Sequence, residues 1–310
     1  MCSHLGGYGL TYGRLPSPEH TGEELPSVRL QTLSTNRANR FEELCDLSDL
    51  KQRENARRVC KIFHKRQINK KEGFYRLDLN EIPTLSKHYE GMELGEGIRE
   101  LQEQLVSPCG TGFLVRPGLV ATAAHVVTDP NTKAPMKLKE LRFLFDFSYI
   151  KSGDQKVIKT EYEYNQVRRA KSLFASSGMQ EEKEIDERED WALVELDEEM
   201  KMGEVSFRGG AVQVGERLYT IGHPMGMPLK KVTGEVKKMQ GLILQTNFGT
   251  WEGNSGSPVF GTDHQVVGMI YAGTNYFKSV GNRIEINRAE PVDYSQSLVR
   301  FGKNWHDTTP

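Results

Sequence analysis

The feature that most constrains the fold is a series of short β-like runs, separated by Gly, Pro, Asn and Asp, that begins near residue 74. Such runs include TGFLVRPGLVATAA, LRFLFDF, QKVIKTEYEY, DWALVEL, AVQVGERLYTIG, GLILQTN, SPVFG and QVVGMIYAG. Many short strands with turn residues between them are typical of an all-β barrel or sandwich. We therefore expect one all-β domain over residues 73–310.

The segments before and after these runs differ from them in composition and in the spacing of their apolar residues. Residues 1–35 are rich in Gly, Pro, Ser and Thr and predict a flexible N-terminal arm. In residues 36–72 apolar side chains recur at helical spacing among many Lys and Arg, which predicts a basic, helical N-terminal extension. A basic run is usually a solvated face, but docking on the acidic run 181–190 and nucleic-acid contact stay open. The tail DYSQSLVRFGKNW predicts a short C-terminal helix.

Composition and charge exclude several classes of protein. The net charge of −1 makes nucleic acid an unlikely partner, and no apolar stretch is long enough to span a bilayer. The first residues lack the pattern of a secretory signal, so we expect a cytoplasmic protein. The cysteines are scattered and predict free, mostly buried thiols; without close ligand pairs we expect no metal site. They are Cys2, Cys45, Cys60 and Cys109.

The run WEGNSGSPVF is either a tight turn between two strands or a nucleophile loop. Gly253 tolerates unusual φ angles, and the backbone N–H groups of Gly253 and Ser255 are placed to converge on one point, where they would bind the oxyanion of a tetrahedral intermediate. Ser257 has no comparable glycine arrangement and is interpreted as structural. A serine nucleophile needs a base beside it, and the base needs a third group that fixes its tautomer.

The chain offers a leading candidate for each of these two roles, and Asp186, Glu187 and Glu189 are poorer candidates for the second because they lie further from the apolar run. His125 follows an apolar run that ends in small residues, which let neighbouring backbone come close. Asp190 stands at the entry of the alternating run DWALVEL, where it can point inward. Each residue also has a simpler interpretation, as a structural histidine or as the end of a solvated acidic run.

Five motifs together decide between these interpretations. TGFLV, ATAAHVV, DWALVEL, IGHPMGMPL and GNSGSPVF occur in this order, and the chain resembles a chymotrypsin-fold, trypsin-like serine protease of the bacterial trypsin-like, HtrA or glutamyl-endopeptidase type. The resemblance implies two six-stranded antiparallel β-barrels, one over about 85–200 and one over about 205–295. It also implies a serine endopeptidase that cleaves protein or peptide substrates without a cofactor. His125 would be the general base, Asp190 its orienting partner and Ser255 the nucleophile.

The resemblance also places the primary substrate pocket. Its lining would be Gly249 and Thr250 together with the run Ile270, Tyr271, Ala272 and Gly273. None of these carries a charge, so we expect an uncharged pocket, unless Lys278 or Arg283 reaches it from a loop. Asn254, where zymogens of the family carry Asp, argues against activation by a new N-terminus.

Three functions of different classes remain in view from the sequence. The favoured one is an intracellular serine endopeptidase, regulated through a protein partner that binds residues 36–72. The others are a pseudoprotease that keeps the fold as a binding module, and a partner- or nucleic-acid-binding protein led by the basic segment.

Overall fold

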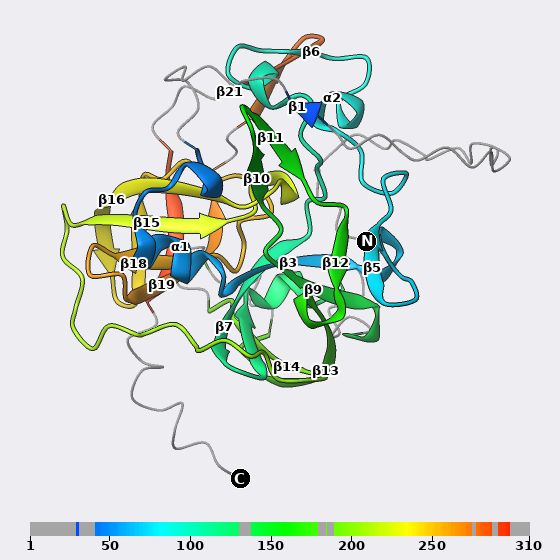
Figure 1. Ribbon diagram of the computed structural model, residues 1–310. Helices are drawn as coiled ribbons and strands as arrows, with labels where there is room; N and C mark the ends of the chain where they lie inside the picture. The colour runs from blue at the N-terminus through cyan, green and yellow to red at the C-terminus, as the bar shows by residue number, and fades with distance from the viewer. Residues whose placement is uncertain are drawn as a thin grey trace, which may run out of the picture.

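A computed structural model describes the chain over residues 41–129, 138–178, 184, 189–274, 277–286 and 291–297, with the backbone of 29–30. Most of it is β-structure, arranged as two barrels (Figure 1). The first is a closed barrel of six antiparallel strands in the order β13-β14-β8-β7-β3-β9. In chain order these are β3 (Val59–His64), β7 (Gly110–Arg116), β8 (Leu119–Thr122), β9 (Leu141–Phe145), β13 (Val167–Ser176) and β14 (Ala192–Leu196).

The second barrel closes in the same way. Its order is β15-β18-β19-β22-β17-β16, and β16 pairs back to β15. The strands are β15 (Arg217–Gly222), β16 (Lys230–Gln240), β17 (Ile243–Thr246), β18 (Pro258–Gly261), β19 (Val266–Gly273) and β22 (Asp293–Ser297). The prediction of two six-stranded antiparallel barrels is confirmed.

Alternation of side chains explains why these runs form barrel strands. In β14, Ala192, Val194 and Leu196 are buried in the core of the first barrel, where they pack with Leu114 and Val120 from β7 and β8. Residues two apart point to the same face of a strand, so this run gives one continuous apolar face. Closing the sheet into a barrel buries that face and leaves no open edge.

The prediction of a helical extension over 36–72 is wrong for most of the described part. The α-helix in this range is α1 (Leu50–Ala56), capped by the Asp49 carboxylate, and β3 follows it as a central strand of the first barrel. Figure 1 shows β3, near the start of the chain, beside β7 and β9. The run Val59–Phe63, apolar except for Lys61, is buried throughout, and a short buried run fits a strand as well as a helix.

The first barrel therefore begins at Val59 rather than near residue 85. The second barrel also takes in an early segment, because β2 (Glu42–Glu43) pairs with β16 at Lys230 and Lys231. Glu43 and Lys230 form a buried ion pair of 2.7 Å there. Burying two charges is costly unless they are paired, so this segment belongs to the folded domain.

The predicted C-terminal helix is also wrong at its start. Asp293–Ser297 is strand β22, which pairs with both β17 and β19 and so closes the second barrel. Alternating partners on both sides favour an extended chain over a helix here. The rest of that prediction lies outside the described residues, as does the acidic run 181–190 apart from residues 184, 189 and 190. Residues 1–28 and 31–35 of the predicted arm, and 36–40 of the predicted extension, lie outside them too.

Several short elements lie outside the two barrel sheets. They are α2 (Leu85–His88) and three small sheets: β1 (Arg29–Leu30), β10 (Tyr149–Ser152) and β11 (Gln155–Ile158); β4 (Ile68–Lys70), β5 (Phe74–Leu77) and β12 (Glu161–Glu163); β6 (Glu93–Leu94), β20 (Phe277–Val280) and β21 (Arg283–Ile286). The cysteines Cys45, Cys60 and Cys109 form no disulfide, but of these only Cys60 is buried, so the prediction of mostly buried thiols is wrong for the described cysteines. Cys2 lies outside the described residues.

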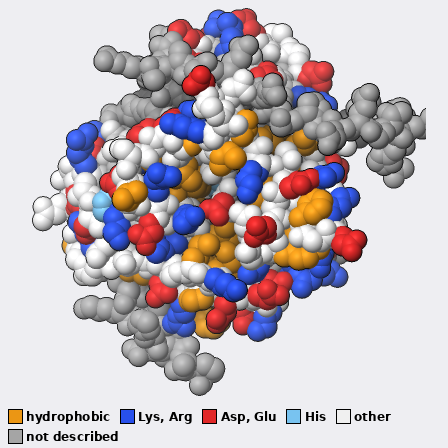
Figure 2. Space-filling view, in the orientation of Figure 1, with side chains coloured by type: hydrophobic (Ala, Val, Ile, Leu, Met, Phe, Trp, Pro, Cys, Tyr) orange, Lys and Arg blue, Asp and Glu red, His pale blue; other side chains and the backbone are white. Residues whose placement is uncertain are grey.

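Charges are mixed over the surface. Lys51 and Arg58 pair with Glu54, and Lys65 pairs with Glu140. On the face seen in Figure 2, basic and acidic side chains are interspersed rather than gathered by sign. No helix among the described residues is both long and apolar enough to cross a bilayer.

Candidate active site

The first barrel brings His125 and Asp190 together at one end. Thr122, the last residue of β8, pairs with Ala192, the first residue of β14, so the turn after β8 lies beside the segment before β14. His125 follows in a short 3-10 turn, and its Nδ1 atom lies 2.6 Å from Oδ2 of Asp190. The second carboxylate oxygen of Asp190 accepts a 3.0 Å hydrogen bond from the backbone N–H of His125. The carboxylate is thereby fixed against both the ring and the backbone of the same residue.

This contact sets the tautomer and the pKa of the histidine. Because Nδ1 faces a carboxylate, Nδ1 carries the proton and Nε2 is left as the acceptor. Burial by itself would lower the pKa of His125, but the charge and hydrogen bond of Asp190, with the charge of Glu252, raise the pKa above its ordinary value. About a third of the His125 side chain is exposed, so a reacting group can approach the imidazole.

Ser255 lies in a pair of consecutive tight turns. The first is closed by Asn254 N donating to Trp251 O over 3.0 Å, and the second by Ser257 N donating to Asn254 O over 2.8 Å. The third residue of each turn is a glycine with positive φ, Gly253 at +91° and Gly256 at +89°. A turn with positive φ at its third residue strongly favours glycine there. The sequence GNSG therefore dictates this double turn.

Hydrogen bonds to the carbonyl groups orient the two amides of the predicted oxyanion hole. The Gly253 N–H belongs to the peptide whose oxygen, Glu252 O, accepts from Met225 N. The Ser255 N–H belongs to the peptide whose oxygen is held by Ser257 N. In a planar trans peptide the N–H points opposite to the C=O, so fixing each oxygen also fixes the direction of each N–H. Within the described part of the chain neither N–H donates a hydrogen bond.

The double turn packs directly against the first barrel. A Cβ atom on Gly256 would overlap the carbonyl oxygen of Thr111 and the hydroxyl of Thr122, and would lie 3.1 Å from the nitrogen of Ala123, two residues before His125. Only glycine allows this approach. The Ser255 turn and the His125 turn therefore meet at the contact between the barrels. Among the described residues the Ser255 hydroxyl makes no hydrogen bond, and in free enzymes such bonds often tighten only with substrate.

The predicted pocket residues divide into two groups. Ile270 packs in the core of the second barrel and Tyr271 against the core of the first, whereas Ala272 is partly buried beside it. Gly249, Thr250 and Gly273 converge on one point, the carboxylate of Asp293.

Asp293 is a residue that the sequence analysis missed. Its side chain is buried and accepts hydrogen bonds from Gly249 N (2.8 Å), Thr250 N (2.9 Å) and the Thr250 hydroxyl. The prediction of an uncharged lining therefore left out one carboxylate beside Gly249 and Thr250, that of Asp293 in strand β22. The cations considered near the pocket are paired elsewhere: Lys278 lies 3.9 Å from Glu285, and Arg283 lies 3.6 Å from the same residue.

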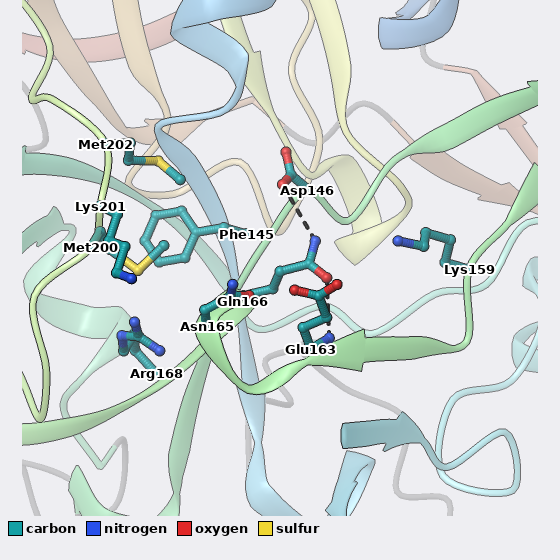
Figure 3. Close-up of a pocket in the computed structure, with 10 residues that line it drawn as sticks. All are labelled: Phe145, Asp146, Lys159, Glu163, Asn165, Gln166, Arg168, Met200, Lys201 and Met202. Atoms are coloured by element: carbon teal, nitrogen blue, oxygen red, sulfur yellow. Dashed lines mark hydrogen bonds between the residues drawn. The ribbon is translucent and has the colours of Figure 1, made fainter. Parts of the chain in front are cut away.

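A cavity of about 300 Å³ opens on the first barrel (Figure 3) and contains none of the predicted site residues. It is lined by apolar and by oppositely charged side chains, among them Phe145, Asp146, Lys159, Glu163, Arg168 and Lys201. Gln166 donates to Asp146 across it over 3.4 Å. Among the described residues no group of three or more His, Cys, Asp or Glu side chains is placed to hold a metal ion.

Comparison with known proteins agrees with this geometry. The profile of the trypsin-like peptidase domain family matches residues 110–269, about half of the chain, from strand β7 into β19. The chain belongs to the trypsin-like peptidase family. The matched segment includes His125, Asp190 and Ser255, and therefore spans both barrels.

Relatives and a solved structure extend the comparison. A probable periplasmic DegP-like serine endoprotease of Rickettsia prowazekii is 25% identical over 206 residues, which cover 62% of this chain and 33% of the relative. The counterpart in Rickettsia conorii is 24% identical with the same coverage. The chain thus spans about a third of the length of these relatives. A solved Glu endopeptidase shares the fold with a TM-score of 0.53 and 13% identity, over 90% of this chain and 100% of the other.

Proposed function

We propose that this chain is a serine endopeptidase that works through a triad of His125, Asp190 and Ser255. The observation that carries the proposal is the 2.6 Å contact between His125 Nδ1 and Asp190, at the barrel end against which the glycine-flanked Ser255 turn packs. Family membership supports the reaction class. The raised pKa of His125 supports its role as a base, because the Asp190 carboxylate also stabilises the imidazolium that forms when the ring takes a proton.

The proposed reaction follows from these positions. Ser255 Oγ attacks the carbonyl carbon of the scissile peptide while His125 Nε2 takes the hydroxyl proton. The N–H groups of Gly253 and Ser255 stabilise the resulting oxyanion. His125 then gives its proton to the leaving amine, and an acyl-enzyme forms on Ser255. Water, activated by the same histidine, releases the acid and restores the serine.

A fluorophosphonate probe tests this proposal. Such a probe phosphonylates a serine that is activated by its base, so the intact chain should be labelled and Ser255→Ala should not. Removing the nucleophile should also lower peptidase turnover by about a millionfold. Ser257→Ala is the matched control, because Ser257 is buried against Asn254 in the same turn and should leave labelling unchanged.

Absence of labelling would contradict the enzyme proposal and favour the pseudoprotease. Labelling that survives Ser255→Ala would place the nucleophile elsewhere. A peptide library applied to the labelled form then reports the cleavage preference. A preference for small or apolar side chains at the cleavage position agrees with the predicted uncharged pocket. A preference for basic side chains there would mean that the Asp293 carboxylate contributes to substrate selection.

Location and regulation stay predictions. We propose a cytoplasmic location, although the names of the Rickettsia relatives place those proteins in the periplasm; cell fractionation distinguishes the two. We also propose that exposed basic side chains within 36–72 bind a regulatory partner. Deleting residues 1–72 would remove β3 from the first barrel, so substitution of Arg53 and Arg57, which are exposed on or next to α1, is the appropriate test.

A further inference from the structure

The Thr111 side chain joins the two barrels directly behind the Ser255 turn. Thr111 lies in β7 of the first barrel and is fully buried. Its hydroxyl donates to the carbonyl oxygen of Gly253 over 2.8 Å and accepts from the backbone N–H of His223 over 3.1 Å. Its own backbone N–H donates to Ser255 O over 2.9 Å.

These contacts have one consistent direction. A hydroxyl carries one proton, and an N–H group can only donate, so the bond from His223 leaves the proton of Thr111 for Gly253 O. Gly253 and His223 are both buried, and water therefore does not replace either bond. One hydroxyl thus satisfies a donor and an acceptor that would otherwise be orphaned.

The carbonyl that Thr111 holds lies between the two amides of the proposed oxyanion hole. Three peptide groups follow one another here. The first carries the Gly253 N–H, the second joins Gly253 to Asn254, and the third carries the Ser255 N–H. Glycine rotates more freely than any other residue, so this middle peptide needs an external restraint. Asn254 N holds one side of it through Trp251 O, and the Thr111 hydroxyl holds the other.

We propose that Thr111 is a positioning residue of the peptidase, whose hydroxyl keeps the Gly253 and Ser255 amides aimed at the oxyanion. The proposal rests on the proposed function. In this proposal a side chain of the first barrel orients the two amides, although both amides belong to the second barrel. The restraint matters in the transition state, where the oxyanion forms, more than in substrate binding.

Thr111→Val tests the hydroxyl, since valine keeps the shape of threonine. We expect kcat to fall by about tenfold to a hundredfold, less than the loss of an oxyanion donor itself, with KM nearly unchanged. Thr111→Ser restores the hydroxyl and should recover most of kcat. Thr220→Val is the control, because Thr220 is a buried threonine of β15 whose hydroxyl bonds Pro258 O outside the double turn; it should affect stability alone.

An NMR measurement decides the same question without activity. Asn254–Ser255 is the only Asn–Ser pair in the chain, so ¹³C-carbonyl Asn with ¹⁵N Ser labelling isolates the Ser255 amide as one signal. We expect that signal to shift or broaden in Thr111→Val and to stay in place in Thr111→Ser and Thr220→Val. This readout remains valid if the chain proves inactive, so failure of the proposed function and failure of the Thr111 role are distinguishable.

Two results would overturn the role of the hydroxyl. One is that Thr111→Val leaves kcat unchanged or, if the chain is inactive, leaves the Ser255 amide signal unchanged. The other is equal impairment of Thr111→Ser and Thr111→Val, which would mean that the methyl group acts through packing.

Discussion

The two halves of the proposed active site are held by different forces. His125 and Asp190, from the first barrel, are half-buried and joined by a charged side-chain contact that shifts the pKa of the histidine. The Ser255 turn of the second barrel is held by backbone hydrogen bonds and by two glycines with positive φ.

This difference predicts which substitutions and conditions should change the activity through each half. A charged pair is sensitive to pH and to changes of charge at constant shape. A turn made of glycines and fixed carbonyls is sensitive to added volume and to lost hydrogen-bond partners. Substitutions of matched kinds therefore separate the two halves.

Asp190→Asn should have the largest effect on the charged half. Asparagine keeps the shape but removes the charge and favours the wrong tautomer of His125, so kcat should fall by about ten-thousandfold. Burial then dominates the histidine, whose pKa falls. Because the base must be neutral, the acid limb of the pH profile should move to lower pH. A pH–rate profile of kcat/KM checks both effects, and an acid limb that stays in place would contradict the assignment of His125 as the base.

Gly253→Ala should have the next largest effect, on the neutral half. The φ of +91° strains any other residue, and a new Cβ would lie 2.6 Å from His223 O and 2.8 Å from Gly226 N. We expect kcat to fall by about a hundredfold to a thousandfold as the oxyanion donor is displaced. The acid limb should not move, because no charge changes.

Gly215→Ala is the control for that substitution. Gly215 has a φ of +85°, but a Cβ there meets nothing within 4 Å. It should cost about 1–2 kcal/mol of stability in urea unfolding and leave kcat unchanged. A similar loss of kcat in both variants would mean that general destabilisation, and not the crowding at the Ser255 turn, explains the result.

Glu252→Gln should have the smallest effect on the pH–rate profile. It tests whether a charge in the Ser255 half changes the pKa of His125 in the other half. Glu252 lies in the Ser255 turn, is exposed, and its charge contributes to the raised pKa of His125. The acid limb should move slightly to lower pH, by less than in Asp190→Asn, with kcat preserved at high pH. Added salt screens exposed charges, so the difference between this variant and the unmodified chain should shrink at high ionic strength.

Local patterns predicted the parts of the site that depend on neighbouring residues. The alternation of Ala192, Val194 and Leu196 predicted the strand beside Asp190, and the two glycines around Ser255 predicted the turn. The partners that lie far away in the chain were not predictable in this way. Asp293 was assigned to a helix, and therefore its contacts with Gly249 and Thr250 could not be expected.

The sequence by itself determined that this chain is built of short β-strands and where the Ser255 turn and the His125 turn lie, because alternation, small residues and glycines act over a few positions. Only the tertiary structure decided that Val59–His64 is a barrel strand and that Thr111 reaches Gly253. Barrel closure places strands side by side according to the whole hydrogen-bond network, and a short apolar run carries no local signal of the partner that it will find.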